Sequence, residues 1–264
     1  MSNRKRWFEK IKETRLFQSI FRHPYPMDKQ SRIRTVLNNF FLHLHPAKVP
    51  ADSLKLRKTW GMGGLTFFFF IILFITGILL AFYYRPTPEH ANEDIRDIIF
   101  VVPFGAFIRN MHRWSSYGML ICMYLHGLRI FLTGSYKQPR EFNWVIGIIL
   151  LVITHFICFT GYLLTWDQAG YWAFTVGSDM AKSAPLLGSD GPFSNYFGVT
   201  PANDLRSLLI GGTELNQPAS LLRSYVLHCF ILPFFFVILM CVHFWRVRKD
   251  NKLDSPVTEQ NENE

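Results

Sequence analysis

Four long apolar runs interrupt the polar pattern of the chain and predict four membrane-spanning helices. The runs cover residues 64–83, 114–132, 144–164 and 225–245. Each has about 20 residues, the length that an α-helix needs to cross roughly 30 Å of hydrocarbon. The pattern therefore predicts an all-α integral membrane protein. Its four-transmembrane-helix bundle occupies residues 61–250, between a basic N-terminal segment (1–60) and a polar C-terminal tail (251–264).

The distribution of positive charge predicts the orientation of these helices. Three quarters of the 28 Lys and Arg residues lie in the N-terminal segment, the connection after the second run and the tail. Since cytoplasmic loops are enriched in Lys and Arg, we expect both termini to be cytoplasmic. The N-terminal segment fits either a basic helix on the membrane surface or a disordered tail.

The composition also narrows the class and the location of the protein. The chain is 49% hydrophobic and 16% aromatic, yet its net charge is +9, a segregation typical of membrane proteins. Anionic lipid accounts for the basic face, so no nucleic-acid partner is expected. No secretory signal precedes the first run. We expect a bacterial inner membrane or an equivalent energy-transducing membrane.

Four histidines share a regular spacing in the second and fourth runs. His112 and His126 are 14 residues apart, and His228 and His243 are 15 apart. In an α-helix these spacings return to within about 40° and 60° of one face, after a rise of roughly 21 Å or more. Because both helices run from outside to inside, His112 should meet His228 at the outer level, and His126 should meet His243 at the inner level.

Pairs of neutral imidazoles suit one cofactor best. Two histidines on opposite sides are typical ligands of a low-spin haem iron, whereas a catalytic zinc would need three protein ligands. The pattern therefore predicts two stacked, non-covalent b haems with bis-histidine ligation. No C-x-x-C-H motif for a c-type haem occurs, and the four single cysteines fit packing roles. His155 has no partner in register and also fits a packing role.

Arginines and glycines around the histidines support this interpretation. Haem propionates require basic partners, which Arg109, Arg113 and Arg129 could supply. Glycines recur with the same 14-residue period in the first and third runs, at Gly63, Gly77, Gly147 and Gly161. Glycine lets a helix approach a flat ligand closely, although ordinary close helix packing would use it too.

Several strings resemble the cytochrome b family, above all the N-terminal four-helix half that is a separate subunit in chloroplast-type bf complexes. They are FYYRPT (82–87), RNMHRW (109–114), LHGLRIFLTGSYKQPRE (125–141), TGYLLTWDQAGYW (160–172) and LHCFILPFFF (227–236). The resemblance implies that His112 and His228 ligate the lower-potential outer haem, and His126 and His243 the inner one. It also implies quinol oxidation outside, with one electron crossing both haems to a quinone inside.

The same resemblance implies partners. These are a Rieske iron–sulfur protein, a separate C-terminal cytochrome b subunit carrying Pro-Glu-Trp-Tyr, a c-type cytochrome or blue-copper acceptor, quinol and quinone, membrane lipid, and a second copy in a homodimeric complex. It places Trp166, Asp167, Gln168 and Tyr171 near the outer quinone site, with loop packing as the alternative.

The sequence departs from the family pattern at several positions, which limits the family properties that can be expected of this chain. Gly61 stands where bf-type relatives carry a cysteine that attaches an extra haem, so a covalent third haem is not expected; a non-covalent inner-side haem stays open. Thr165 replaces a proline, and the stretch 184–224 is longer. Two other functions compete with this interpretation. One is a di-haem anchor of a dehydrogenase or hydrogenase, against which the 166–172 strings argue, and the other is a non-redox transporter or scaffold, which leaves the histidine registers unexplained.

Overall fold

The described part of the protein is helical. The computed structural model describes residue 14 and residues 60–212 and 217–251, and no β-strand occurs among them. The predictions for the N-terminal segment and the C-terminal tail fall almost wholly outside the described residues.

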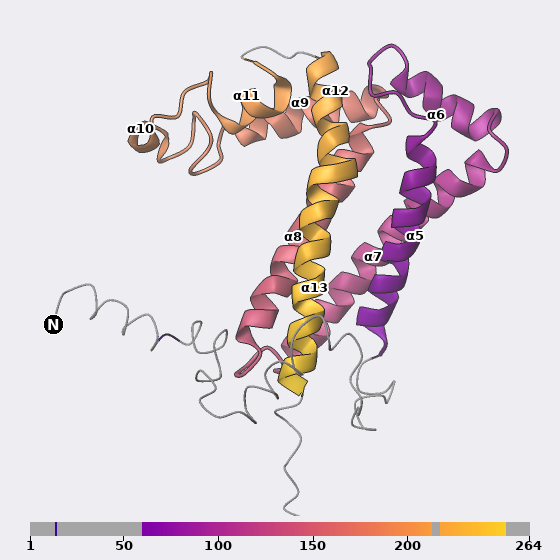
Figure 1. Ribbon diagram of the computed structural model, residues 1–264. Coiled ribbons are helices and arrows are strands. Elements are labelled where there is room, and N and C mark those ends of the chain that lie inside the picture. The colour runs from indigo at the N-terminus through magenta and orange to yellow at the C-terminus, as the bar shows by residue number, and fades with distance from the viewer. Residues whose placement is uncertain (1–13, 15–59, 213–216, 252–264) are drawn as a thin grey trace, which may run out of the picture. The chain divides into compact units, whose positions relative to one another are not determined.

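Long helices cover all four predicted spans (Figure 1). They are α5 (Met62–Ala81), α7 (Gly105–Leu132), α8 (Glu141–Leu163) and a final run made of α12 (Gln217–Val226), the π-helix η3 (Leu227–Ile231) and α13 (Leu232–Asn251). Among the described residues, Met62–Ala81, Glu141–Leu163 and Pro218–Lys249 are long and apolar enough to cross a membrane.

The helix α7 differs from the other three spans. It has 28 residues, but its first turns carry Arg109, His112 and Arg113, and it is not among the described helices that are long and apolar enough to cross a membrane. The predicted span 114–132 is the more apolar C-terminal part of this helix. Its place in the membrane stays a prediction from the sequence.

The chain divides into two compact units, and every long helix contributes to both. One unit comprises Met1–Gly64, Cys122–Leu151 and Val237–Glu264, and the other comprises Leu65–Ile121 and Val152–Phe236. We call them the His126 unit and the His112 unit. Each predicted histidine pair therefore lies complete within one unit.

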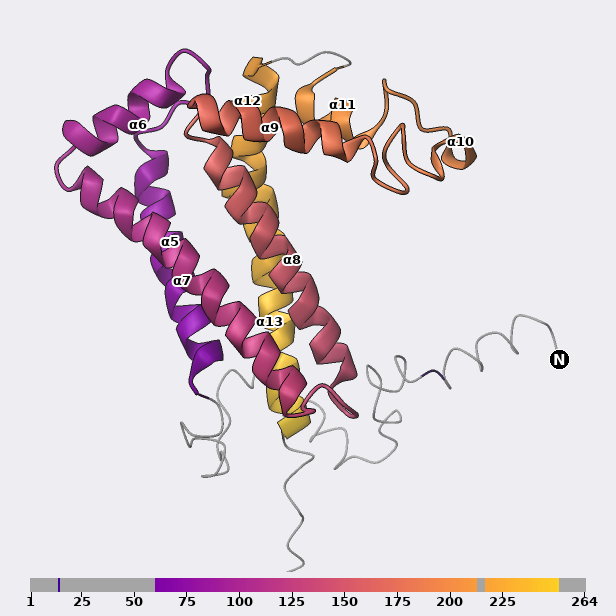
Figure 2. The same ribbon diagram turned by 180° about the vertical axis from the view of Figure 1, so that it is seen from behind.

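Short helices follow the ends of the long ones in the His112 unit. They are α6 (Ala91–Phe100), α9 (Gln168–Ala181), α10 (Ser194–Phe197) and α11 (Leu205–Ile210). Figure 2 shows α9 turning away from the end of α8. A buried apolar cluster joins α6, α9 and α11 to the ends of α8 and α12; its members are Ala91, Leu163, Trp166, Phe174, Ile210 and Leu221. The long apolar runs of the sequence do not indicate the short helices, because none of these is long enough to form such a run.

Asp94 fastens the connection between α5 and α6. Its side chain is 5% exposed and accepts hydrogen bonds from the Arg85 backbone nitrogen at 2.7 Å and from Arg85 Nη2 at 2.5 Å. The hydrogen bond from the Arg85 guanidinium lowers the pKa of Asp94, against the opposing effect of burial. An ionised carboxylate thus stabilises the connection between α5 and α6.

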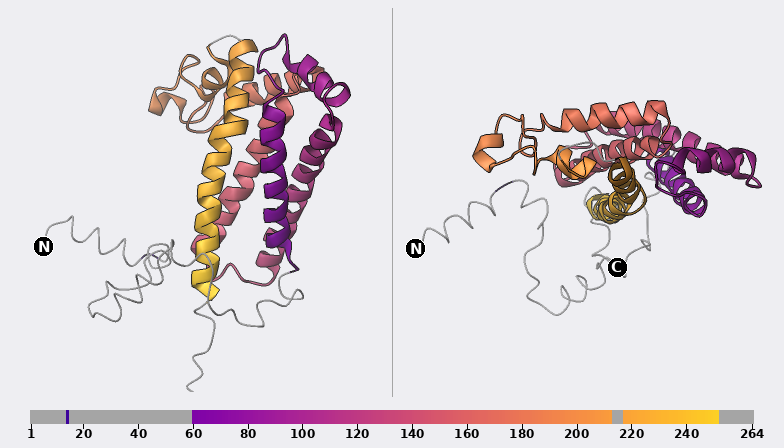
Figure 3. Two further views of the ribbon diagram at one scale, coloured as in Figure 1. Left: turned by 45° about the vertical axis from the view of Figure 1, so that its right-hand side comes forward. Right: turned by 90° about the horizontal axis from the view of Figure 1, so that it is seen from above.

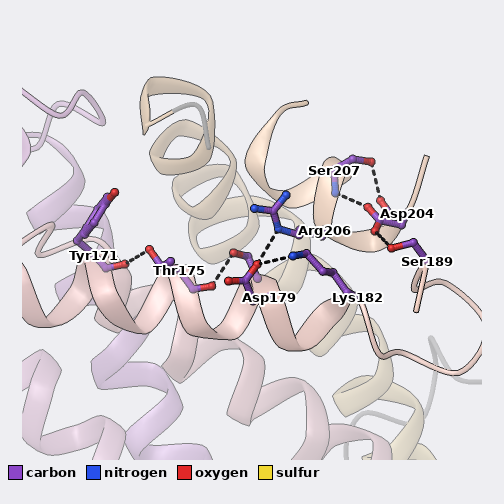
Figure 4. A network of polar contacts seen from close by, with 9 residues as sticks. Tyr171, Thr175, Asp179, Lys182, Ser189, Asp204, Arg206 and Ser207 are labelled. Atoms are coloured by element: carbon purple, nitrogen blue, oxygen red, sulfur yellow. Dashed lines mark hydrogen bonds and ion pairs between the residues drawn. The ribbon is translucent and has the colours of Figure 1, made fainter. Parts of the chain in front are cut away.

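A polar network attaches α11 to α9 (Figure 4). Asp179 on α9 pairs with Lys182 Nζ at 3.0 Å and Arg206 Nε at 2.9 Å. The buried Asp204 caps α11 by accepting from the Ser207 backbone nitrogen at 2.7 Å, and also accepts from Ser189 Oγ at 2.7 Å. These contacts hold both ends of the excursion 182–204, which carries α10 (Figure 3).

Large apolar side chains remain exposed along the spans. Examples on α5 are Phe68, Phe74 and Ile75, each more than half exposed, and Phe234 and Phe235 repeat the pattern on α13. Such surfaces are unfavourable in water and favourable against lipid chains. The exposure therefore agrees with a membrane-embedded chain.

Candidate functional site

His112 on α7 and His228 in η3 face each other in the His112 unit. Their ring centroids are 6.2 Å apart, with an angle of 70° between the ring planes. A metal bound by both rings would need about 2.0 Å to each nitrogen and about 1.1 Å from nitrogen to centroid, which gives a centroid separation of roughly 6.2 Å. The observed separation therefore fits one iron between the two imidazoles.

Each of the four glycines with the 14-residue period lies against one histidine. A Cβ on Gly77 would lie 3.3 Å from His112 Cε1, and one on Gly161 would overlap the His228 ring. In the His126 unit, the corresponding distances are 3.6 Å from Gly63 to His126 Cε1 and 3.5 Å from Gly147 to His243 Cε1. The missing side chains thus leave space beside every imidazole, as a flat cofactor would require.

Hydrogen bonds define which nitrogen of His228 can bind a metal. His228 Nδ1 is 2.9 Å from the Ile157 carbonyl oxygen, which can only accept, so Nδ1 carries the proton. Nε2 then keeps its lone pair for a metal. Thr160 Oγ1 lies 3.5 Å from the same Nδ1, and Thr76 Oγ1 lies 2.9 Å from His112 Nδ1.

The two threonines were missed in the sequence, although a signal was present. Thr76 directly precedes Gly77, and Thr160 directly precedes Gly161. A hydroxyl placed before each glycine of one pair could have been recognised as a partner for an imidazole nitrogen.

The π-helix corrects the geometry that an ideal helix predicts. A uniform α-helix leaves His228 and His243 about 60° apart in direction. In the structure His228 lies within η3 (Leu227–Ile231), and a π turn takes one extra residue compared with an α turn. The spacing of 15 therefore behaves like the spacing of 14 on α7. Such π turns are frequent at functional sites.

His126 and His243 form the second pair, in the His126 unit. His126 is an electrostatic neighbour of His243, and the Asn143 backbone lies beside the His243 ring. Arg246, one turn after His243, is fully buried, with its guanidinium carbon 5.2 Å from the centre of the Phe142 ring.

The three arginines predicted to bind propionates all lie on α7. Within the described part of the chain, no carboxylate forms an ion pair with Arg109, Arg113 or Arg129. Arg113 contacts Tyr117, with Nε 3.4 Å from the hydroxyl, and the Arg129 guanidinium carbon lies 5.7 Å from the Trp60 ring centre. Their positions near the histidine levels on α7 leave them suited to anionic groups.

The predicted quinone-site residues form the start of α9. Asp167 caps the helix by accepting from the Gly170 backbone nitrogen at 2.8 Å. Trp166 is 9% exposed and lies edge-on to Tyr171, with the ring centroids 5.9 Å apart. Gln168 is the first residue of the helix. Helix capping and packing therefore account for the local positions of Trp166, Asp167 and Tyr171.

A surface depression of about 430 Å³ lies elsewhere in the His112 unit. Residues from the excursion, α11 and α12 line it, among them Leu187, Val199, Leu205 and Arg223. None of the predicted site residues belongs to its lining.

Comparisons with known proteins identify the family. The model of the family Cytochrome b/b6/petB matches residues 48–251. The cytochrome b6 of Acaryochloris marina is 42% identical over 188 residues, covering 71% of this chain and 80% of the relative. The cytochrome b6 of Heliomicrobium gestii is 40% identical over 199 residues, covering 75% and 86%.

A solved structure shares the fold. A chain described as hyperthermophilic respiratory Complex III matches with a TM-score of 0.64 and 23% identity. The match covers 89% of this chain but only 58% of that chain, so this chain spans less than two thirds of it.

The helical spans and the family match together define a membrane-bound haem protein of electron transport. The chain belongs to the cytochrome b family, and is similar to its separate b6 form. As a cytochrome b, it is the b subunit of a bc-type complex.

Proposed function

We propose that this subunit holds two non-covalent b haems and carries electrons between them across the membrane. His112 and His228 ligate one haem, and His126 and His243 ligate the other. The single observation that carries this proposal is the 6.2 Å separation of the His112 and His228 rings, which matches two imidazoles on one iron. The glycine beside each histidine supports the same assignment at both levels.

The chain's own residues prepare both sites for the group. When bound, haem supplies a one-electron couple. The Ile157 carbonyl fixes the tautomer of His228, and the glycines keep side chains away from the rings. Arg109, Arg113 and Arg129 would hold the propionates. Apolar helix surfaces exclude water, which limits side reactions of the reduced site.

The direction of transfer and the partners extend the proposal. Electrons enter from quinol at the outer side, and those that cross the membrane reduce a quinone at the inner, cytoplasmic side, where both termini lie. A Rieske protein, a c-type cytochrome, a second copy and a separate subunit carrying Pro-Glu-Trp-Tyr complete the complex in a bacterial inner membrane. The start of α9, including Asp167 and Gln168, borders the outer quinone region. Family membership and the lopsided Lys and Arg distribution support these assignments.

A haem count on the purified protein tests the central claim. The chain would be isolated in detergent with its membrane partners, and reduced-minus-oxidised spectra recorded with a pyridine haemochrome count. We expect two extractable b haems per chain. His228→Ala and His126→Ala should each remove a different one, whereas the control His155→Ala should keep both. One haem or none in the unsubstituted chain would refute the proposal.

Sidedness needs a separate measurement. Membrane vesicles of known orientation would be labelled with an impermeant thiol reagent, after the four native cysteines are replaced and single cysteines are placed near the start of α12 or the end of α13. Labelling of the C-terminal end from the cytoplasmic side is expected. Labelling from the opposite side would reverse the assignment of outer and inner haem without affecting the haem count.

A further inference from the structure

Two buried threonines contact the imidazoles of one histidine pair. Thr76 is 8% exposed and Thr160 is 7% exposed. Thr76 Oγ1 lies 2.9 Å from His112 Nδ1, whereas Thr160 Oγ1 lies 3.5 Å from His228 Nδ1, at the limit of a hydrogen bond. His228 Nδ1 already has the Ile157 carbonyl at 2.9 Å. The Thr76 contact is therefore the stronger of the two.

The hydrogen on the Thr76 hydroxyl is already used. Thr76 Oγ1 donates to the Ile72 carbonyl oxygen at 2.6 Å, in the preceding turn of α5. A hydroxyl has one hydrogen, so the oxygen presents only lone pairs to His112. His112 Nδ1 must then carry the proton and donate it to Thr76, with the Leu73 backbone carbonyl as a second acceptor beside the ring. The result is an Nε2 lone pair free for a metal.

The second histidine pair has no such hydroxyl at the equivalent positions. Met62 precedes Gly63, which lies against His126, and Ile146 precedes Gly147, which lies against His243. Neither the thioether of Met62 nor the hydrocarbon of Ile146 can replace the hydroxyl oxygen as an acceptor of comparable strength. The threonine–glycine pairs thus distinguish the two sites chemically.

We propose that Thr76 is a positioning residue that strengthens His112 as an iron ligand and lowers the reduction potential of the haem held by His112 and His228. An acceptor on Nδ1–H raises the basicity of Nε2. A stronger donor stabilises ferric iron more than ferrous iron, because the ferric ion carries the higher charge. This inference rests on the proposed two-haem function and adds a cause for unequal potentials.

Redox titration of the purified complex tests the proposal with matched variants. Thr76→Val keeps the shape and removes the hydroxyl acceptor but leaves the Leu73 backbone in place, Thr76→Ser restores a hydroxyl, and Thr160→Val removes the weaker contact. In Thr76→Val, the ratio of reduced to oxidised haem at His112 and His228 should rise at least threefold at a fixed potential. The other haem should titrate as before. Thr76→Ser should return the ratio to that of the unsubstituted chain, and Thr160→Val should change it less than Thr76→Val.

A second variant, which introduces a hydroxyl at the other histidine pair, tests the proposal even if Thr76→Val does not fold. Ile146 is 3% exposed and β-branched, so Ile146→Thr places a hydroxyl before Gly147 with little change of shape. It should lower the reduced fraction of the haem held by His126 and His243 at a fixed potential. The buried hydroxyl must find the preceding-turn carbonyl, as Thr76 does, for this to occur.

The outcomes that overturn the proposal differ from failure of the proposed function. Unchanged potentials in Thr76→Val would overturn the role of Thr76, as would equal shifts of both haems or a Thr76→Ser variant that behaves like Thr76→Val. A rise rather than a fall in the reduced fraction for Ile146→Thr would also contradict it. Failure of the two-haem function would appear earlier, as fewer than two b haems in the unsubstituted chain.

Discussion

The replacement of Gly161 by alanine offers the sharpest structural test of haem binding. A Cβ at this position would overlap His228 Cε1 and lie 2.9 Å from Nδ1 and 3.1 Å from Nε2. The His228 ring cannot move away freely, because its Nδ1 is bonded to the Ile157 carbonyl. Gly161→Ala should therefore displace the ring or break that hydrogen bond, and in either case misdirect Nε2.

The size of the effect follows from two opposing contributions. Overpacking a well-filled site costs about 1–3 kcal/mol. Alanine in place of glycine inside a helix contributes up to about 1 kcal/mol of stabilisation to the fold, but nothing to the geometry of the ring. Since about 1.4 kcal/mol corresponds to a tenfold change in affinity, haem at this site should dissociate roughly 10-fold to 100-fold faster.

The assay measures haem transfer from the purified protein to an excess of a haem-scavenging apoprotein, followed by absorbance at two wavelengths. Gly64→Ala is the matched control, since no other group of the described residues lies within 4 Å of a Cβ at that helical position. The effect should decrease in the order Gly161→Ala, Gly77→Ala, Gly63→Ala, as the Cβ contacts lengthen. Equal dissociation rates in Gly161→Ala and Gly64→Ala would refute the reasoning.

Three further predictions concern the π turn and the attached helices. Deleting Phe230, which is 61% exposed, should convert the π turn to an α turn and keep both haems. Deleting Phe230 and Phe234 together should instead rotate His243 by about 100° about the helix axis. The double deletion should therefore lose one haem in the pyridine haemochrome count. Asp204→Ala should destabilise α11 by about 1 kcal/mol, seen as faster hydrogen exchange in 205–210, with Asp190→Ala as an exposed-loop control. In the unsubstituted chain, burial opposes ionisation of Asp204, but hydrogen bonds from Ser207 and Ser189 outweigh it and lower its pKa. The stabilisation should thus be complete above about pH 4 and be lost as the pH falls through the lower folded-state pKa. Protection factors in α11, corrected for the intrinsic pH dependence of amide exchange, that stay constant in this range would contradict it.

The long helices could be predicted because a membrane span leaves a direct signal in the chain. Uninterrupted apolar residues at 64–83 and 144–164 correspond to α5 and α8 within a few residues. The last helix begins earlier than its apolar run, at Gln217 rather than near 225, because polar residues such as Ser220 and Arg223 alternate with apolar ones in the turns that pack on α11. Hydropathy alone cannot locate such a start.

The candidate site was predictable in its residues and less so in its geometry. Period counting alone selected His112, His228 and their glycines. It could not show that His228 lies in a π turn, since that depends on backbone hydrogen bonds rather than on residue type. It also could not show that Arg246 is buried, because a long cationic side chain near a span usually reaches the interface.

The order in which the chain is made sets when the histidine pairs can form. Each pair takes one member from α7 and the other from the last long helix, at His228 or His243. Neither pair exists while the ribosome is still producing residues before η3, however well the first three spans have inserted. Binding of a cofactor between two histidines must then be a late step of biogenesis. A nascent chain stalled after α11 would present two half-sites on α7 and no complete site.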